Sequence, residues 1–350
     1  MTSGTRADPR RAMSRPWTWR GTNLALLAVL VLVFATGVGA VATGAPRGGW
    51  VMIAHDVVGL VVIVLIPPKS RVVAGGVRRR RPSRWMSVGL AVLALASLAA
   101  GIVSSSGVLR TVAGLEPLWI HIALPLLLVP LLIWHLAARP VRPRPADLSR
   151  RTVVRAGLLA AVGAGIYAGL DGTVRLVDLP GARRRFTGSH AVDPASTPVT
   201  TWLDDAVPHV DGGGWRLTVA DADGRRDLSL DSLVASGTTT VRATLDCTSG
   251  WYVTQDWTGV PVAQLIRRID PAHRSIRVRS LTGYDRYLPL SDLDHLLLAV
   301  GSDGGPLPPG HGYPARLVAP GRRGFWWVKW VAAVELSRRP WWAQPPFPVA

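Results

Sequence analysis

The chain has 350 residues, and its 40 basic and 22 acidic side chains give a formal net charge of +18. Such a charge often indicates a nucleic acid or anionic surface as partner, but residues 1–171 carry +15 of it and residues 172–350 only +3. This distribution argues against a nucleic-acid partner and predicts a basic membrane half followed by an ordinary soluble domain. The single cysteine, Cys247, excludes an intramolecular disulfide and a C-x-x-C-H site for c-type haem.

Four long apolar runs follow a basic tail, residues 1–22, and each approaches the roughly 20 residues that cross a bilayer. They cover residues 23–43, 51–67, 85–103 and 118–138, and a fifth, Gly/Ala-rich run covers residues 153–170. The second run is short and is expected to end at Pro67 and Pro68. The first half is therefore predicted to be an all-α transmembrane bundle of four spans, residues 23–138, with a fifth anchoring span.

A Pro- and Arg-rich linker, residues 139–147, leads to the sequence LSRRTVVR at residues 148–155. This sequence has the form of a twin-arginine export signal, an address read by a receptor. Cargo exported in this way crosses the membrane folded, usually with a cofactor already inserted. No A-x-A-like cleavage site follows the fifth run, so residues 139–171 are predicted to be a linker with an uncleaved anchor.

The positive charges predict the topology, because Lys and Arg in short loops stay on the cytoplasmic side. Eighteen basic residues lie before the first span, between the second and third, and around the entry to the fifth, whereas the two other loops hold only Arg47 and Arg110. We therefore expect a multi-pass protein of a prokaryotic cytoplasmic membrane. Its N-terminus would be cytoplasmic and its C-terminal domain extracytoplasmic.

Three histidines lie within the predicted spans, where ionisable side chains are costly enough to suggest function. In the predicted topology, His55 and His121 lie at the same depth near the outer ends of the second and fourth spans. Two imidazoles at one level can ligate a haem iron from both sides, so this pair predicts one haem b. His135 lies roughly 21 Å deeper on nearly the same face of the fourth span, but the position that would pair with it holds Lys69. We interpret His135 as structural, and histidines near helix ends can also bond to carbonyls or headgroups without binding haem.

Beyond the anchor, short β-type segments separated by Gly, Pro and Asp predict an exported α+β, mainly β, domain over residues 172–350. The expected strands cover residues 215–220, 238–246, 276–281, 295–300, 315–319 and 326–334. The clearest helical segment is 261–269, which opens with a proline in its first turn. Residues 171–200 are expected to form an extended tether.

Cys247 ends one of these strands and is followed closely by a glycine that permits a tight turn. A thiolate at such a position would be a soft metal ligand. A lone cysteine at a strand end is, however, more often a small buried hydrophobic residue. The local residues leave both interpretations open.

The surrounding segments carry a family resemblance. Residues 247–266, CTSGWYVTQDWTGVPVAQLI, contain the cysteine, a turn to Gly-Trp and a Trp-x-Gly-Val-Pro segment leading into a helix. TGYDRYLPL follows at 282–290, then GHGYPARLVAPG at 310–321, with Lys329 and Glu335 beyond. This order resembles the molybdopterin domain of the sulfite oxidase family, in particular the branch with the periplasmic methionine-sulfoxide reductase catalytic subunit. It spans about residues 217–337, and the multi-span half outside it resembles a b-type cytochrome.

By this resemblance Cys247 would be the protein thiolate on molybdenum, with a molybdopterin dithiolene supplying other sulfur ligands for oxygen-atom transfer. His311, Gly312, Arg316 and Lys329 match positions around the pterin and its phosphate, where cationic donors suit an anionic ligand. Lys329 also stands out by composition, because the chain has 38 arginines and two lysines. It could alternatively extend from an apolar strand to solvent.

The resemblance also implies that Tyr284 and Arg286 line a substrate pocket, although a tyrosine beside a turn is more often structural. Asp246 departs from the family pattern, in which a basic or neutral residue more commonly precedes the cysteine. Thr248 and Ser249 likewise replace acidic or small residues, so the substrate does not carry over. The expected partners are a small molecule or an oxidised or reduced sulfur compound, and a quinone or other electron carrier.

Two alternatives to a haem-linked molybdenum oxidoreductase stay open. In the first, the enzyme lacks haem and the spans form an anchor or a quinone site. In the second, the exported part is a cofactor-free binding module in which Cys247 is an inert core residue. The second alternative leaves the twin-arginine motif unexplained.

Overall fold

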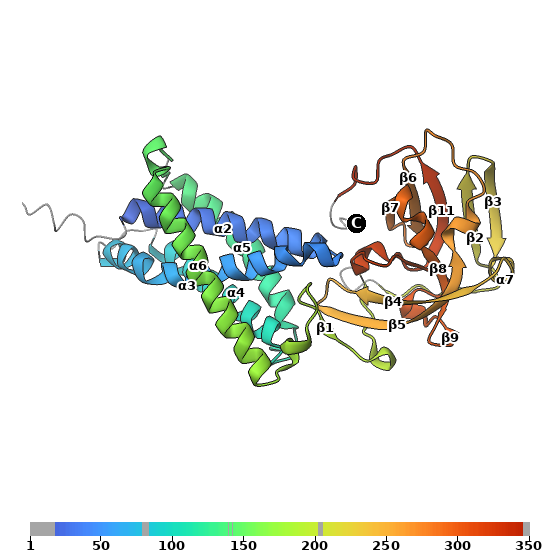
Figure 1. Ribbon diagram of the computed structural model, residues 1–350, viewed down its shortest axis with the longest axis horizontal. Coiled ribbons are helices and arrows are strands. Elements are labelled where there is room, and N and C mark those ends of the chain that lie inside the picture. The colour runs from blue at the N-terminus through green and yellow to red at the C-terminus, as the bar shows by residue number, and fades with distance from the viewer. Residues whose placement is uncertain (1–17, 79–83, 139, 142, 202–205, 346–350) are drawn as a thin grey trace, which may run out of the picture. The chain divides into compact units, whose positions relative to one another are not determined.

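The computed structural model describes residues 18–78, 84–138, 140–141, 143–201 and 206–345 (Figure 1). Most of the predicted basic tail, residues 1–17, and the arginine-rich residues 79–83 lie outside the described residues. The chain divides into two compact units. The first includes residues 50–183 together with the chain up to residue 40, and the second comprises residues 41–49 and the chain from residue 184.

The first unit consists of long helices formed by the apolar runs. They are α2 (Trp19–Ala42), α3 (Gly49–Arg78), α4 (Arg84–Ser106), α5 (Pro117–Ala138) and α6 (Arg150–Leu176), with 3-10 turns η2 (Pro145–Asp147) and η3 (Pro180–Arg183). Among the described residues, these five helices are long and apolar enough to cross a membrane, by length and composition. Large apolar side chains such as Leu126, Leu127 and Ile133 are exposed on α5. The prediction of an N-terminal segment of apolar helices is confirmed.

Two of these helices are longer than predicted. The expectation that the second run ends at Pro67 and Pro68 is wrong, because α3 continues through both prolines to Arg78. Proline removes one backbone donor, but ending the helix within an apolar segment would leave several backbone groups unpaired. α6 extends past residue 170 to Leu176, and its last turn carries an ion pair between Arg175 and Asp171 (2.7 Å).

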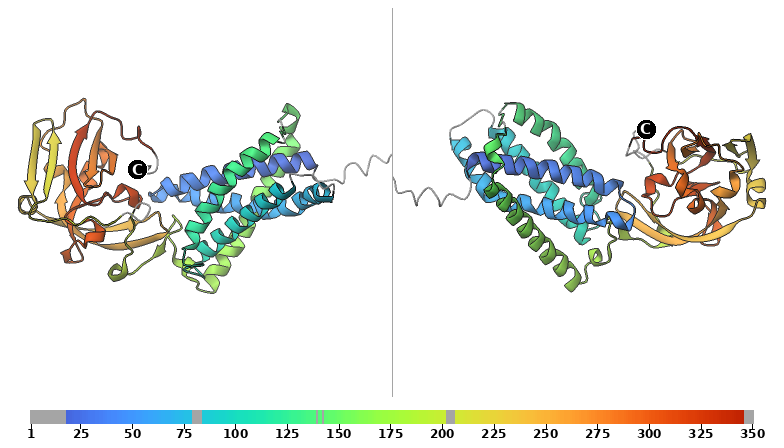
Figure 2. Two further views of the ribbon diagram at one scale, coloured as in Figure 1. Left: turned by 180° about the vertical axis from the view of Figure 1, so that it is seen from behind. Right: turned by 45° about the horizontal axis from the view of Figure 1, so that its top comes forward.

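The second unit is a domain of two sheets with short helices (Figures 1 and 2). Its strands are β1 (His190–Ala191), β2 (Arg216–Asp221), β3 (Gly224–Ser229), β4 (Thr239–Asp246), β5 (Trp251–Pro261), β6 (Ser275–Ser280), β7 (Asp285–Pro289), β8 (Leu297–Ser302), β9 (Gly305–Pro306), β10 (Arg316–Val318) and β11 (Val331–Ser337). Its helices are α7 (Leu230–Ala235) and α8 (Val262–Leu265), and its 3-10 turns are η1 (Pro46–Gly48), η4 (Pro194–Ser196), η6 (Leu290–His295), η7 (Pro309–His311) and η8 (Gly324–Trp326).

The first sheet has the order β1-β5-β8-β10, with β4 also paired to β5 and β9 to β8, and the second has the order β3-β2-β11-β6-β7. β1 is parallel to β5 and β11 is parallel to β2, whereas the other pairs are antiparallel. Apolar side chains of both sheets, such as Val219 on β2, Trp257 on β5 and Leu298 on β8, belong to one buried core. This sheet-rich domain agrees with the predicted mainly β, α+β class.

Each of the six predicted strands has a counterpart, whereas β1, β3, β5, β7 and β9 were not among the expected strands. Three further predictions differ from the structure. The predicted strand 326–334 begins only at Val331, because Trp330 has a φ of 51° that interrupts extended backbone. The predicted helix 261–269 shortens to Val262–Leu265. Residues 184–200, predicted to be a tether, belong to the second unit, where β1 pairs with β5.

Candidate functional site

Cys247 lies in the tight turn that joins β4 to β5. Its N–H donates to the carbonyl of Trp251 (2.9 Å), and Gly250, with a φ of 92°, donates to the carbonyl of Cys247 (3.2 Å). A positive φ of this size favours glycine, so Gly250 allows the turn to close. The antiparallel β4–β5 pairing extends to the base of this turn. A rigid hairpin therefore presents the cysteine.

Cys247 is buried, with 8% of its surface exposed, and its sulfur contacts two hydroxyl groups. Ser249 Oγ lies 3.2 Å from Sγ, and Thr200 Oγ1 lies 3.7 Å from it. Gly324 approaches the same turn so closely that an added Cβ would lie 3.1 Å from the Cys247 Cα. The thiol is therefore held in a confined polar environment, and neither Thr200 nor Ser249 was predicted from the sequence to belong to the site.

Arg316, on β10, is almost completely buried at 1% exposure. Its guanidinium lies over the rings of Trp257 (5.0 Å) and Trp327 (5.8 Å). Among the residues that the structure describes, its Nε and Nη1 atoms have no hydrogen-bond partner. Burial lowers the pKa of Arg316 to about 10, and the negative charge of a Cys247 thiolate partly offsets this by raising the pKa. An unpartnered buried cation is costly, so this geometry suits an anionic ligand.

Lys329 and His311 lie close enough to Arg316 for its charge to lower their pKa values. Burial, and secondly the charge of Arg316, lowers the pKa of Lys329 to about 7, although its Nζ donates to the carbonyls of Gly310 (2.7 Å) and Thr200 (2.9 Å). Burial also lowers the pKa of His311 to about 4, with Arg316 and Lys329 contributing. At neutral pH His311 is therefore neutral, and added negative charge would favour protonated Lys329.

Gly312 brings these groups together. Its φ is 111°, and a Cβ at this position would lie 2.9 Å from the Arg316 Cβ and 3.2 Å from the Lys329 Cβ. A side chain would thus force the two basic residues apart. Of the site residues predicted in this domain, the structure gathers Cys247, His311, Gly312, Arg316 and Lys329.

Tyr284 and Arg286 form a separate cluster with η8. The Tyr284 hydroxyl donates to the carbonyl of Phe325 and accepts from Arg286 Nε (2.8 Å). The Arg286 guanidinium also lies over the Phe325 and Trp326 rings and donates to the carbonyl of Pro345 (2.9 Å). Burial raises the pKa of Tyr284, so its phenol stays protonated. A place for these two residues in a substrate pocket stays a prediction.

In the first unit, His55 on α3 and His121 on α5 lie side by side. Their ring centroids are 5.8 Å apart with an interplanar angle of 81°. His55 Nδ1 lies 3.0 Å from the carbonyl of Val33, and His121 Nδ1 lies 2.8 Å from the carbonyl of Ser97. With Nδ1 protonated and donating to a carbonyl, each ring keeps Nε2 as its basic nitrogen.

Two glycines make room for these imidazoles. A Cβ on Gly37 would lie 3.0 Å from the His55 ring, and one on Gly101 would lie 2.9 Å from His121 Nδ1. Small residues at these points allow the helices to approach the rings closely. The sequence analysis did not assign either glycine to the pair.

Neither site is complete as a metal centre by itself. In the described parts of the chain, no three His, Cys, Asp or Glu side chains gather closely enough to hold a metal ion. The Cys247 thiolate alone, or the imidazoles of His55 and His121 alone, would leave most coordination positions of a metal ion unfilled. Both arrangements therefore suit a cofactor that brings its own donor atoms, as a dithiolene or a porphyrin does.

Residues 204–344 match the family described as the oxidoreductase molybdopterin binding domain. The catalytic subunit of the protein-methionine-sulfoxide reductase MsrP from Xanthomonas campestris is 29% identical over 173 residues, which are 43% of this chain and 51% of that protein. The same subunit from Xanthomonas axonopodis is 28% identical over 172 residues, with the same coverage. The crystal structure of the sulfane dehydrogenase SoxCD from Paracoccus pantotrophus aligns with a TM-score of 0.36 at 24% identity, covering 38% of this chain and 40% of that one. The chain spans about half the length of the curated relatives it matches.

Proposed function

We propose, from the match of residues 204–344 to the oxidoreductase molybdopterin binding domain family, that the chain is a membrane-anchored molybdenum oxidoreductase linked to a haem. The observation that carries the molybdenum part is the buried Arg316 side chain. Two of its nitrogen atoms have no partner among the described residues, and it lies within electrostatic range of Cys247. A cofactor-free binding module would keep this charge buried without compensation.

The residues around Cys247 fit molybdopterin in both charge and ligand number. Cys247 would supply the protein thiolate, and Arg316 and Lys329, which Gly312 allows to lie close together, would hold the anionic pterin phosphate. Molybdenum bound by the pterin dithiolene supplies two-electron oxygen-atom transfer. Trp257 and Trp327 cover the Arg316 guanidinium, which excludes water and strengthens its attraction to an anion.

The Ser249 hydroxyl is positioned to donate a hydrogen bond to the Cys247 thiolate (3.2 Å). Such a bond withdraws charge from sulfur and favours the reduced metal. We expect Ser249→Ala to lower the molybdenum reduction potential by on the order of 30 mV, measured by redox titration of the molybdenum signal. Thr200→Val, which removes the longer 3.7 Å contact, should change the potential less. An unchanged potential in Ser249→Ala would contradict this role.

The sequence pattern supports a position of this domain outside the cytoplasmic membrane. The five apolar helices and the eighteen-to-two distribution of basic residues indicate a cytoplasmic N-terminus. Ser149 caps α6 by accepting a bond from the Thr152 N–H (3.3 Å), so the twin-arginine motif forms the start of this helix. Arg150 and Arg151 are exposed there, and an export receptor could reach them.

His55 and His121 fit a b-type haem. Their ring centroids lie 5.8 Å apart, so the two imidazoles would be close enough together to supply two nitrogen ligands to one haem iron. The carbonyls of Val33 and Ser97 orient the two rings through Nδ1, and Gly37 leaves space beside His55. The bound haem would link the molybdenum domain to a quinone or another electron carrier.

For the substrate we propose a small sulfur compound, with sulfoxides as the first class to examine. This rests on the name of the two relatives, which are protein-methionine-sulfoxide reductase subunits. Because the similarity covers about half of each relative, the substrate has to be measured on this chain. Either direction of electron flow is compatible with one molybdenum centre and one haem.

Metal content and a reduced-minus-oxidised visible spectrum of the full-length protein in detergent test the proposal. We expect molybdenum near one per chain together with a b-type haem spectrum. Cys247→Ala should lose molybdenum and keep the haem spectrum. Molybdenum without haem would leave an enzyme with a plain anchor, and fully matured protein without molybdenum would refute the proposal.

A further inference from the structure

Asp246, immediately before Cys247, is a buried carboxylate with an unusually complete set of donors. Its side chain is 3% exposed. Oδ1 accepts from Ser189 Oγ (2.7 Å) and Arg323 Nη1 (2.6 Å), and Oδ2 accepts from Thr187 Oγ1 (2.7 Å) and Arg185 Nε (3.1 Å). Four donors saturate both oxygens, so the carboxylate has one defined orientation.

Arg323 extends this network to the cysteine itself. While Nη1 binds Asp246, its Nη2 donates to the Cys247 carbonyl (3.1 Å). Arg323 is 3% exposed, and the neighbouring Gly324 allows its backbone to approach the turn. One guanidinium thus joins the side chain before the cysteine to the backbone of the cysteine.

The other donors come from residues 185–189, outside the family match that begins at residue 204. Thr187 and Ser189 are buried, at 6% and 0% exposure. This segment directly precedes β1, which pairs with β5 on the far side of the Cys247 turn. Residues 185–189, which precede the family match, therefore support the turn that carries Cys247, the candidate metal ligand.

Stability alone does not account for such a network. A buried ion pair often contributes no more stability than apolar residues of similar volume, because desolvation offsets the attraction. What a saturated network adds is one defined geometry. For a thiolate ligand, that geometry sets the direction of the sulfur and hence the electronic properties of a bound metal.

We propose that Asp246 and Arg323, with Arg185, Thr187 and Ser189, are positioning residues that orient the Cys247 thiolate toward its metal. This inference rests on the proposed function. It adds a part of the site from outside the matched domain, and it accounts for an aspartate where the family pattern more commonly has a basic or neutral residue.

The test compares Asp246→Asn with Asp221→Asn in the full-length protein. Asp221 provides the matched control, because its side chain is also buried (0% exposed) and is paired with an arginine, Arg226 (3.1 Å). It lies at the end of β2 and binds the Arg267 and Asp223 N–H groups. Both variants should lower the thermal unfolding midpoint. Only Asp246→Asn should alter the electron paramagnetic resonance signal of molybdenum and shift its reduction potential.

If Asp246→Asn does not fold, variants that each remove a single hydrogen bond to Asp246 provide the test instead. Thr187→Val and Ser189→Ala each remove one donor, and we expect them to shift the signal in the same direction by less. A wild-type signal and potential in all three variants, with only stability reduced, would overturn the positioning role. Absence of molybdenum from fully matured wild-type protein would instead refute the proposed function, so the two failures are distinguishable.

Discussion

Replacing Arg316 by methionine is expected to have opposite effects on the cofactor-free and cofactor-loaded protein. Without cofactor, the buried guanidinium lacks partners for two of its nitrogen atoms among the described residues, so its removal should stabilise the fold by about 1–4 kcal/mol. The same change removes a cation proposed to hold the pterin phosphate. Loss of one partner of a buried ionic contact costs about 2–5 kcal/mol, so molybdenum per chain should fall at least about tenfold.

The measurements are thermal unfolding of cofactor-free protein and metal analysis of matured protein. Arg279→Met serves as a control, because Arg279 is an arginine of the same domain with a side chain 39% exposed and paired to Glu335 (3.4 Å). Arg279→Met should neither stabilise the cofactor-free protein nor lower the molybdenum content of the matured protein. Normal molybdenum content in Arg316→Met would show that this residue does not hold the cofactor.

Replacing His121 by leucine is expected to abolish the b-type haem spectrum. Only His55 of the pair would remain to hold the haem, and the Ser97 carbonyl would lose the ring it orients. Haem per chain should fall at least about tenfold, while molybdenum stays near the wild-type value. Gly101→Ala should also reduce haem content, because its Cβ would lie 2.9 Å from His121 Nδ1.

Haem content by absorbance, normalised to protein and molybdenum, checks this expectation. His135→Leu is the matched control, since His135 lies on the same helix, α5, and was interpreted as structural. A haem spectrum that survives in His121→Leu but disappears in His135→Leu would relocate the haem. A protein without haem in any form would reduce the membrane helices to an anchor.

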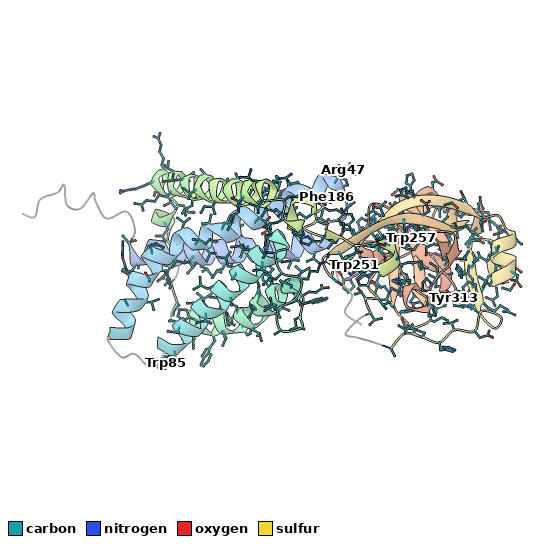
Figure 3. The ribbon with its side chains drawn as sticks, turned by 90° about the horizontal axis from the view of Figure 1, so that it is seen from below. Arg47, Trp85, Phe186, Trp251, Trp257 and Tyr313 are labelled. Atoms are coloured by element: carbon teal, nitrogen blue, oxygen red, sulfur yellow. The ribbon has the colours of Figure 1, made fainter. Side chains whose placement is uncertain are left out.

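The helices and most strands could be predicted from the sequence because their signals are local. The apolar runs are long, and segments such as Thr239–Asp246 are rich in β-branched residues bounded by turn formers. The strand β5 was not predicted, although the burial of its side chains alternates strictly from Trp251 through Trp257. Both tryptophans are labelled in Figure 3. Its residues were interpreted only as part of a family motif. The alternation of buried and more exposed residues along this segment is typical of a strand and could have identified β5 from the sequence.

The site was predictable only in part. Cys247, Arg316 and Lys329 lie in recognisable blocks, and the structure brings them together. Thr200 could not be assigned, because its contact with Cys247 joins residues 47 positions apart and its own segment was interpreted as a tether. Asp246 was recognised as a departure from the family pattern, but its meaning depends on donors supplied by a distant part of the chain.

The contact between Ser189 and Arg323 has a consequence for the order of events during synthesis. These residues are separated by 134 positions, and a ribosome working at about 5–20 residues per second needs roughly 7 to 27 s to make the interval. Among the described residues, five apolar helices long enough to cross a membrane precede Ser189. The turn that carries Cys247 therefore completes its contacts only after these helices have left the ribosome's catalytic centre. A cofactor that required the finished turn would accordingly be inserted only after residue 323 had been made.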